Sequence, residues 1–198
     1  MPPKFGTSGL RGLVTDLTDD LVAAYIHAFI ASCDTGGCVH VGRDLRPSSP
    51  DIAGAVIDAI RAAGLTAIDH GALPTPALAL ASMAAGHAAV MVTGSHIPAD
   101  RNGLKFYVPS GEIGKDDEQA ILAHLDVPKT DTPLGPLHHQ TTALPTYVAR
   151  YASAFGPSAL SGLRIGVYEH SSVARDVLHD VLQALGADAI PLARSDTF

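Results

Sequence analysis

One stretch of the sequence places a nucleophile, an imidazole and an amine after an apolar run. In VMVTGSHIPADRNGLKFY, from Val90 to Tyr107, the apolar residues end near Gly94 and are followed by Ser95, His96 and, further on, Lys105. A serine can carry an acyl or a phosphoryl group as a covalent intermediate. Acyl transfer uses a G-x-S-x-G elbow, which this stretch lacks, and triad partners usually come from elsewhere in the chain, so His96 is poorly placed as the base for Ser95. The stretch therefore favours phosphoryl transfer.

Phosphoryl transfer needs cations and backbone N–H groups beside the nucleophile, and three further loops offer them. They are GTSGLRG (6–12), GRDLRPSS (42–49) and LPTPA (73–77). With the Ser95 stretch they contain five of the thirteen basic residues, namely Arg11, Arg43, Arg46, Arg101 and Lys105. Ligands of open α/β sheets bind at the carboxyl ends of the strands, where such loops converge. An acidic chain that gathers its cations there is expected to bind an anion, and arginine suits phosphate.

Each of these loops also has an interpretation without a ligand. GTSGLRG is typical of a flexible N-terminal turn, and LPTPA of a turn that starts a helix. In GRDLRPSS, Arg43 and Asp44 can form a structural ion pair, while Ser48 and Ser49 cap the next helix.

Short apolar runs alternate with amphipathic helical patterns along the chain. The predicted strands are Cys38–Val41, Thr66–Asp69, Ala88–Thr93, Lys105–Val108, Arg164–Tyr168 and Asp188–Leu192. The predicted helices are Pro50–Ala63, with Ser49 as N-cap and Gly64 as terminator, Tyr147–Phe155 and Ser172–Leu185. This alternation predicts an α/β fold with a mixed, mainly parallel sheet flanked by helices.

A proline-rich segment divides the chain. Residues 127–145, VPKTDTPLGPLHHQTTALP, contain four prolines and no helical period, so they are predicted to be a linker. The first domain is then 1–145, linker included, and 146–198 is the start of a second one. One βαβ unit cannot cover both faces of its sheet. We therefore expect this second domain to be incomplete and to be capable of self-association.

Composition narrows the classes of partner. A formal net charge of −7 argues against nucleic acid or an anionic membrane surface. The start MPPKFGTSGL lacks the apolar run of a signal peptide, and no stretch is long and apolar enough to span a membrane. Cys33 and Cys38 lack a second ligand pair, so we expect reduced thiols and a cytoplasmic location. The histidines are scattered without the spacing of a known metal site, and His138–His139 are expected to be solvated.

The order and spacing of four motifs resemble the α-D-phosphohexomutases, the phosphomannomutase/phosphoglucomutase superfamily. The motifs are FGTSGLRG, VGRDLRPSS, LPTPAL and VTGSHIPADRNGLKFY. The resemblance covers the whole first domain, and residues from about 146 resemble the opening of the family's second domain. It implies an enzyme that interconverts hexose 1-phosphates and 6-phosphates, with mannose favoured over glucose, through a phosphoserine and a bound 1,6-bisphosphate.

The resemblance also implies roles for individual residues. Ser95 would carry the phosphate and offer it to Mg²⁺, His96 adjoins it, Lys105 would be the general acid/base, and Arg11 would steady the transferring phosphate. A phosphoserine bears nearly two negative charges, which suits this cationic setting. The residues implied to bind phosphate or substrate are Thr7, Ser8, Gly9, Arg43, Arg101 and Asn102.

The chain also departs from the family pattern. Family members often have Ala and Asn where this sequence has Gly94 and Ile97. No D-x-D-x-D run is present, so of the Mg²⁺ ligands the chain can supply only the phosphoserine oxygen, and we expect no turnover by it alone. Glucose or mannose 1,6-bisphosphate is the implied activator. The alternatives are a non-catalytic fragment that binds phosphate or a partner and, third, a phosphoglucosamine mutase, although those usually have Asp at the position of Ser8.

Overall fold

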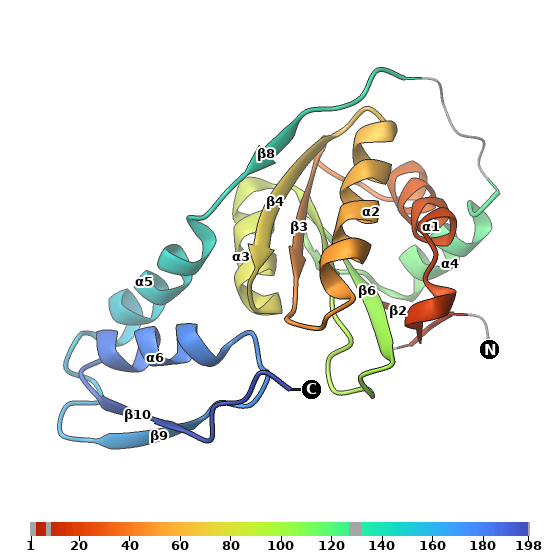
Figure 1. Cartoon of the computed structure of the whole chain (residues 1–198). Coiled ribbons are helices and arrows are strands. Elements are labelled where there is room, and N and C mark those ends of the chain that lie inside the picture. Colours follow the sequence, from red (N-terminus) through yellow and green to blue (C-terminus); the bar gives the residue numbers. More distant parts are fainter. Residues whose placement is uncertain (1–2, 7–8, 127–131, 198) are drawn as a thin grey trace. The chain divides into compact units, whose positions relative to one another are not determined.

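The computed structural model describes residues 3–6, 9–126 and 132–197 (Figure 1). The chain forms two compact units, Met1–Gln140 and Thr141–Phe198.

Unit 1 is built on one mixed sheet. Its strands are β1 (Lys4–Phe5), β2 (Gly9–Leu13), β3 (Cys38–Arg43), β4 (Thr66–Ala72), β5 (Ala88–Val92), β6 (Arg101–Val108), β7 (Gly111–Glu112) and β8 (Leu137–His139). They lie in the order β1-β2-β6-β5-β3-β4-β8, with β7 paired to β6. The neighbouring strands β5, β3, β4 and β8 run parallel to one another, whereas β6 is antiparallel to both β5 and β2. The predicted α/β fold class is confirmed.

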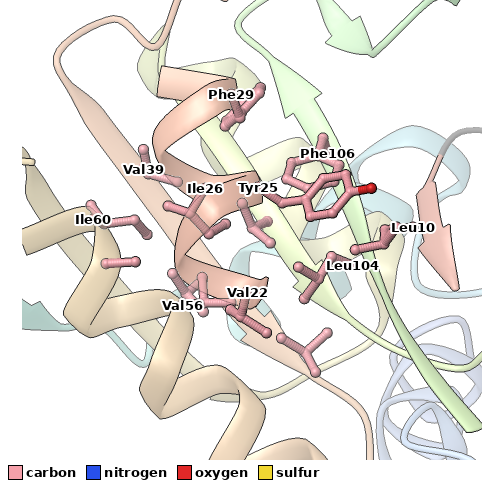
Figure 2. Packing of buried hydrophobic residues seen from close by; sticks show 14 of the residues in the cluster. Leu10, Val22, Tyr25, Ile26, Phe29, Val39, Val56, Ile60, Leu104 and Phe106 are labelled. Carbon is pink, nitrogen blue, oxygen red and sulfur yellow. The ribbon is translucent and has the colours of Figure 1, made fainter. Parts of the chain in front are cut away.

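Helices cover the sheet on both faces. They are α1 (Asp19–Ser32), α2 (Ser49–Ala62), α3 (Thr75–Ala85) and α4 (Lys115–Ala123), with a short 3-10 helix at Val14–Asp16. On one face, α1, α2 and α4 bury the main hydrophobic core against β3, β5 and β6, as Figure 2 shows around Phe29 and Phe106. Because side chains alternate along β3, Gly42 faces the other side of the sheet. A Cβ at Gly42 would meet Leu73 and Leu78, and since Leu78 belongs to α3, this helix packs on that side.

Part of the segment predicted to be a linker is ordered against unit 1, and its last residues, from Ala143, begin helix α5 of unit 2. Residues 127–131 lie outside the described residues, but Leu137–His139 form β8, which pairs with the edge strand β4. Before it, Gly135 exchanges hydrogen bonds with Arg61 of α2, donating through its N–H and accepting from the guanidinium. The prediction of a plain linker is thus wrong for this part. An exposed edge strand offers unpaired N–H and C=O groups, and even a proline-rich segment can satisfy some of them.

Unit 2 is small and has a single two-stranded sheet. It contains α5 (Ala143–Phe155), β9 (Arg164–Tyr168), α6 (Arg175–Ala184) and β10 (Asp188–Leu192), with β9 and β10 parallel. Helix α6 packs against both strands and buries Val167 and Val177. Tyr168 and Leu192, which pair across the two strands, are exposed.

Three histidines that are scattered in the sequence form a chain inside unit 1. His40 of β3 is buried, with Nδ1 2.8 Å from Nε2 of His70 and Nε2 3.2 Å from Nδ1 of His87. His40 uses both ring nitrogens on other imidazoles, so the three rings form a row and do not converge on one point. Burial, with the nearby charges of His70 and His87, lowers the pKa of His40 to about 4.

Two smaller predictions can be compared with the structure. Cys33 and Cys38 are both free thiols. Across the described ranges of the chain, no helix has the length and apolar character that a membrane crossing requires.

Candidate active site

Ser95 lies at the tip of the sheet in a strained backbone conformation. The Ser95 loop (Thr93–Asp100) joins β5 to β6, and the side chain of Ser95 is exposed. Its φ of 52° lies in the left-handed region, which non-glycine residues adopt at a cost of about 1 kcal/mol or more. The N–H of Ser95 donates to the hydroxyl of Thr93 at 3.0 Å, so a side chain two residues earlier helps to hold this turn.

His96 contacts the hydroxyl of Ser95 directly. Its Nδ1 lies 3.2 Å from Oγ of Ser95, within hydrogen-bond distance. Sequence reasoning expects His96 to be poorly placed as the base for Ser95, but in the structure the two side chains are in contact. With Nδ1 unprotonated, His96 can accept the Ser95 hydroxyl proton.

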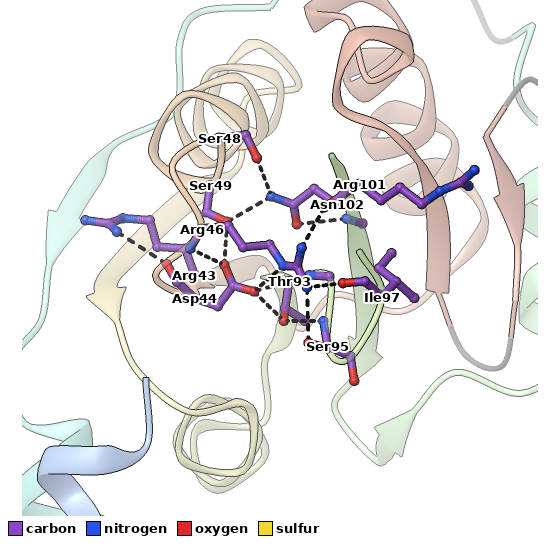
Figure 3. A network of polar contacts seen from close by, with 12 residues as sticks. Arg43, Asp44, Arg46, Ser48, Ser49, Thr93, Ser95, Ile97, Arg101 and Asn102 are labelled. Atoms are coloured by element: carbon purple, nitrogen blue, oxygen red, sulfur yellow. Dashed lines mark hydrogen bonds and ion pairs between the residues drawn. The ribbon is translucent and has the colours of Figure 1, made fainter. Parts of the chain in front are cut away.

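A buried carboxylate ties the loop to the start of α2. Asp44 accepts hydrogen bonds from the N–H of Arg46 (3.0 Å), the hydroxyl of Ser49 (2.6 Å), the hydroxyl of Thr93 (2.8 Å) and the N–H of Gly94 (3.2 Å) (Figure 3). Its ion-pair partner is Arg46, at 3.4 Å from Nε. The predicted Arg43–Asp44 pair is therefore corrected: Arg43 reaches only the backbone carbonyl of Asp44.

Arg46 is the hub of this network. Its side chain is 1% exposed, and its two terminal nitrogens donate to four backbone carbonyls of the loop and the first residue of β6. Nη1 reaches Pro98 (2.8 Å) and Arg101 (3.0 Å), and Nη2 reaches Ser95 (3.2 Å) and Ile97 (2.7 Å). Sequence reasoning counted Arg46 among the anion-binding cations, but it binds the protein itself.

Three cations line up on the sheet face opposite the main core. Leu10 and Leu104 point into that core, so alternation turns Arg11, Arg101 and Lys105 of β2 and β6 to the other face. Arg11 pairs with Gly103, whose carbonyl accepts the N–H of Thr93. Arg11 therefore lies two strand spacings, about 10 Å, from the base of the Ser95 loop. This face can offer positive charge to an anion carried on Ser95.

Lys105 shares this face but lies one step further from the loop. It pairs with Met91 of β5 and Gly9 of β2. Its amine forms an ion pair with Glu112 of β7 at 3.0 Å. In this structure the proposed acid/base is therefore held by a carboxylate.

The remaining predicted site residues lie elsewhere. Asn102 is buried on the face of the sheet that α2 covers, where its amide donates to the hydroxyls of Ser48 and Ser49, so the prediction that it binds phosphate is not supported. It links β6 to α2. Figure 3 shows Arg43 extending away from Ser95 on the far side of Asp44.

Gly9 is buried in β2, where its carbonyl accepts the N–H of Gly6. Thr7 and Ser8 lie outside the described residues. The structure thus brings Ser95 and His96 into contact, and it places Arg11, Arg101 and Lys105 on one face of the neighbouring strands β2 and β6.

The residues present do not make a magnesium site by themselves. Within residues 3–6, 9–126 and 132–197, no three His, Cys, Asp or Glu side chains are grouped so as to hold a metal ion. Mg²⁺ prefers near-octahedral oxygen ligation, and a phosphorylated Ser95 would supply only the oxygens of its phosphate.

An exposed serine near several cationic side chains has the chemistry that suits a phosphate group. The family model described as "Phosphoglucomutase/phosphomannomutase, alpha/beta/alpha domain I" matches residues 2–131. The chain therefore belongs to the phosphoglucomutase/phosphomannomutase family and contains its domain I, which confirms the resemblance seen in the sequence.

Individual relatives agree with this assignment. A phosphomannomutase of Sinorhizobium fredii is 47% identical over all of this chain and 44% of its own length. A phosphomannomutase of Salmonella muenchen is 46% identical, over 98% of this chain and 41% of its length. The chain thus spans less than half the length of the curated relatives it matches.

Solved structures share the fold. A putative phosphomannomutase from Thermus thermophilus superposes with a TM-score of 0.79 at 23% identity, covering 100% of this chain and 47% of that one. A family protein from Burkholderia thailandensis gives a TM-score of 0.76 at 26% identity, covering 93% and 42%.

Proposed function

We propose that this chain is the N-terminal part of a phosphohexomutase that interconverts hexose 1-phosphate and hexose 6-phosphate, with mannose as the favoured hexose. The observation that carries the proposal is Ser95, which is exposed and held at a positive φ. The strands β2 and β6 beside its loop turn Arg11, Arg101 and Lys105 to one face. The preference for mannose is supported by the two relatives at 46–47% identity, which are phosphomannomutases.

The first chemical step transfers a phosphoryl group from Ser95 to the sugar. A free hydroxyl oxygen of the hexose monophosphate bonds to phosphorus, the bond between phosphorus and Oγ of Ser95 breaks, and the hydroxyl gives up its proton to a base. In the second step Oγ attacks the other phosphate of the bound 1,6-bisphosphate, and the departing sugar oxygen takes a proton. Arg11 and Arg101 stabilise the charge on the transferring group throughout.

Two side chains of this chain can handle the protons. Lys105 serves the sugar hydroxyl once its amine leaves Glu112, since an ion pair at 3.0 Å occupies it in this structure. His96, at 3.2 Å from Oγ, takes the Ser95 proton when the serine is itself the nucleophile and returns it when the serine leaves.

The proposal extends to cofactor, partners and location. Mg²⁺, when bound, would neutralise part of the charge on the phosphoserine, with its further ligands coming from outside the described residues. A hexose 1,6-bisphosphate is the proposed activator and a phosphosugar the proposed partner, in the cytoplasm, with no nucleic acid or membrane partner.

Two other functions are tested against this one. The first is a non-catalytic fragment that binds phosphate or a partner. The second is a phosphoglucosamine mutase, which is supported by relatives such as that of Desulforudis audaxviator, 34% identical over 97% of this chain and 45% of its own length.

The test is intact mass spectrometry of the chain after incubation with glucose 1,6-bisphosphate and Mg²⁺. We expect a gain of one phosphate that peptide mapping places on Ser95. Ser95→Ala should abolish the gain, whereas Ser110→Ala, at an exposed turn, should keep it. If the chain binds phosphosugars but never gains a phosphate, the non-catalytic alternative replaces this proposal. Comparing mannose and glucosamine bisphosphates as donors separates the two mutases, and turnover by this chain alone would overturn its expected incompleteness.

A further inference from the structure

We propose that Arg46 is the positioning residue of the Ser95 loop, and that Gly94 precedes the serine because the guanidinium of Arg46 occupies the space of a side chain there. This inference deepens the proposed phosphoryl transfer and rests on it for its functional part. Its structural part concerns the loop alone.

The first observation is the number of bonds that Arg46 makes to the loop. Four carbonyls, from Ser95, Ile97, Pro98 and Arg101, converge on its two terminal nitrogens at 2.7–3.2 Å. The guanidinium is a rigid planar fork, and each terminal nitrogen carries two N–H groups in fixed directions. A lysine in this place has one ammonium with three donors, so it cannot satisfy four carbonyls spread around the loop.

The second observation is the strain at the nucleophile. The left-handed φ of 52° at Ser95 persists because both of its backbone polar groups are held, the N–H by Thr93 and the carbonyl by Arg46. If the carbonyl is released, the loop can relax to a common conformation, and Oγ then leaves its present direction beside His96.

The third observation is the contact at Gly94. A Cβ built on Gly94 would lie 2.4 Å from Cζ and 2.4 Å from Nε of Arg46. Gly94 is not among the positive-φ glycines, so its backbone would accept alanine and only the space forbids it. The guanidinium ends a flexible side chain, but its four carbonyl bonds fix it. In this chain a methyl group at 94 must therefore break some of those bonds, so family members with Ala at this position must hold the loop by other contacts.

The buried charge strengthens the case for a specific geometry. Arg46 is paired with Asp44, which itself binds Thr93 and Gly94, so the cation and its counter-ion hold the same loop from two sides. Removing the cation would leave a buried carboxylate unpaired and endanger folding. Arg46→Lys keeps the charge and removes only the fork, so it is the informative variant.

The experiment is a double-mutant cycle with Arg46→Lys, Gly94→Ala and their combination, with Arg61→Lys as control. Arg61 also binds a backbone carbonyl, but near the far end of α2. Hydrogen exchange of peptides covering 93–101 should be about tenfold faster in each single variant, while peptides from α1 and β3 are unchanged. The double variant should be no worse than the more affected single one, because lysine leaves room for the methyl group.

The functional readout is the rate at which Ser95 gains phosphate from glucose 1,6-bisphosphate and Mg²⁺. We expect Arg46→Lys and Gly94→Ala to slow it by at least about tenfold, since small misplacements of a reacting group have effects of this size. Gly94→Ala leaves the buried ion pair chemically intact, so it keeps the test valid if Arg46→Lys does not fold.

The outcomes separate the two proposals. If the wild-type chain gains no phosphate, the proposed function fails, but the exchange cycle still decides on Arg46. If exchange in 93–101 is unchanged in Arg46→Lys, or the two substitutions are additive, the positioning role is overturned. If the wild type gains phosphate and both variants gain it at the same rate, the loop geometry has no bearing on transfer and the functional part is overturned.

Discussion

The amine of Lys105 lies 3.0 Å from a carboxylate oxygen of Glu112, on the cationic face beside the Ser95 loop. The two side chains are 23% and 40% exposed, so water weakens their attraction and the pair contributes little to stability. The pair matters more for anion binding, because Glu112 is itself an anion and lies next to the residues proposed to attract phosphate.

The first prediction is that Glu112→Gln strengthens the binding of inorganic phosphate by about two- to fivefold at low salt, and that added salt reduces the difference. The increase in melting temperature with phosphate concentration measures this affinity. Glu118→Gln, which removes a carboxylate paired with Lys115 on α4, is the control and should not change it. If Glu112→Gln leaves the phosphate affinity unchanged, Lys105 does not contribute to anion binding on this face.

A second prediction follows from the histidine chain. The pKa of buried His40 is lowered to about 4, and burial also lowers the pKa of His70, partly offset by Asp69. Well above pH 6.5, at about pH 7.5 and higher, these histidines are largely neutral in both the folded and the unfolded chain, so they do not affect the pH dependence there. As the pH falls toward 4, His40 is protonated in the unfolded chain but stays neutral in the folded one, so the free energy of unfolding decreases.

Urea unfolding between pH 7.5 and 4.5 measures this effect, which is on the order of 1 kcal/mol per pH unit for a single histidine. His40→Asn should flatten the acid slope, and His138→Asn, an exposed histidine of β8, should leave it unchanged. An identical slope in His40→Asn and the wild type would show that carboxylates alone set the acid sensitivity.

The third prediction concerns the strain at Ser95. Glycine adopts a positive φ without a steric penalty, so Ser95→Gly should be at least as stable as the wild type, even though it has no phosphate carrier. Melting temperatures of Ser95→Gly and Ser95→Ala test this, with the alanine variant expected to be the less stable of the two. A clearly less stable glycine variant would mean that contacts of the Ser95 side chain, and not its backbone, dominate this turn.

The fourth prediction is self-association through unit 2. Tyr168 and Leu192 are paired across the β9–β10 sheet and are 68% and 49% exposed, so two large apolar side chains lie next to each other on an uncovered part of this sheet. Light scattering on a sizing column should show a mass that grows with protein concentration. Leu192→Lys should reduce it, whereas Leu134→Lys, at a residue of unit 1 that is 66% exposed, should not. A monomer at all concentrations would contradict the prediction.

The elements with strong local signals were predictable from the sequence. Helix α2 has its apolar stripe, with Pro50 in its first turn, and begins within one residue of the predicted start. Helix α1 had an equally clear signal that was overlooked: Thr18 as N-cap, two aspartates in the first turn, and Val22, Ile26 and Phe29 on one face. Strand β2 has no such signal, because a glycine-rich segment becomes a strand only through its pairing with β6.

For Ser95 the sequence predicts a chemistry, which stays a prediction, but not the arrangement of the residues around the serine. Residue types and order pointed to a phosphate-carrying serine with cations nearby. The part that Arg46 takes could not be inferred, because it depends on contacts with carbonyls 52 and 55 positions away in the sequence. Backbone carbonyls are present at every residue, so no sequence pattern marks the ones that a buried guanidinium will select.

The long-range bonds of Arg46 also have a consequence for the order of folding. The conformation of the Ser95 loop depends on Arg46, which follows β3 in the chain. The loop can therefore not become ordered until β3 and β5 have paired in the sheet. Closing such distant contacts is slow compared with forming a helix. The loop should therefore be among the last parts of unit 1 to become ordered, and a partly folded chain that already has its helices would still lack the Ser95 conformation on which the proposed transfer depends.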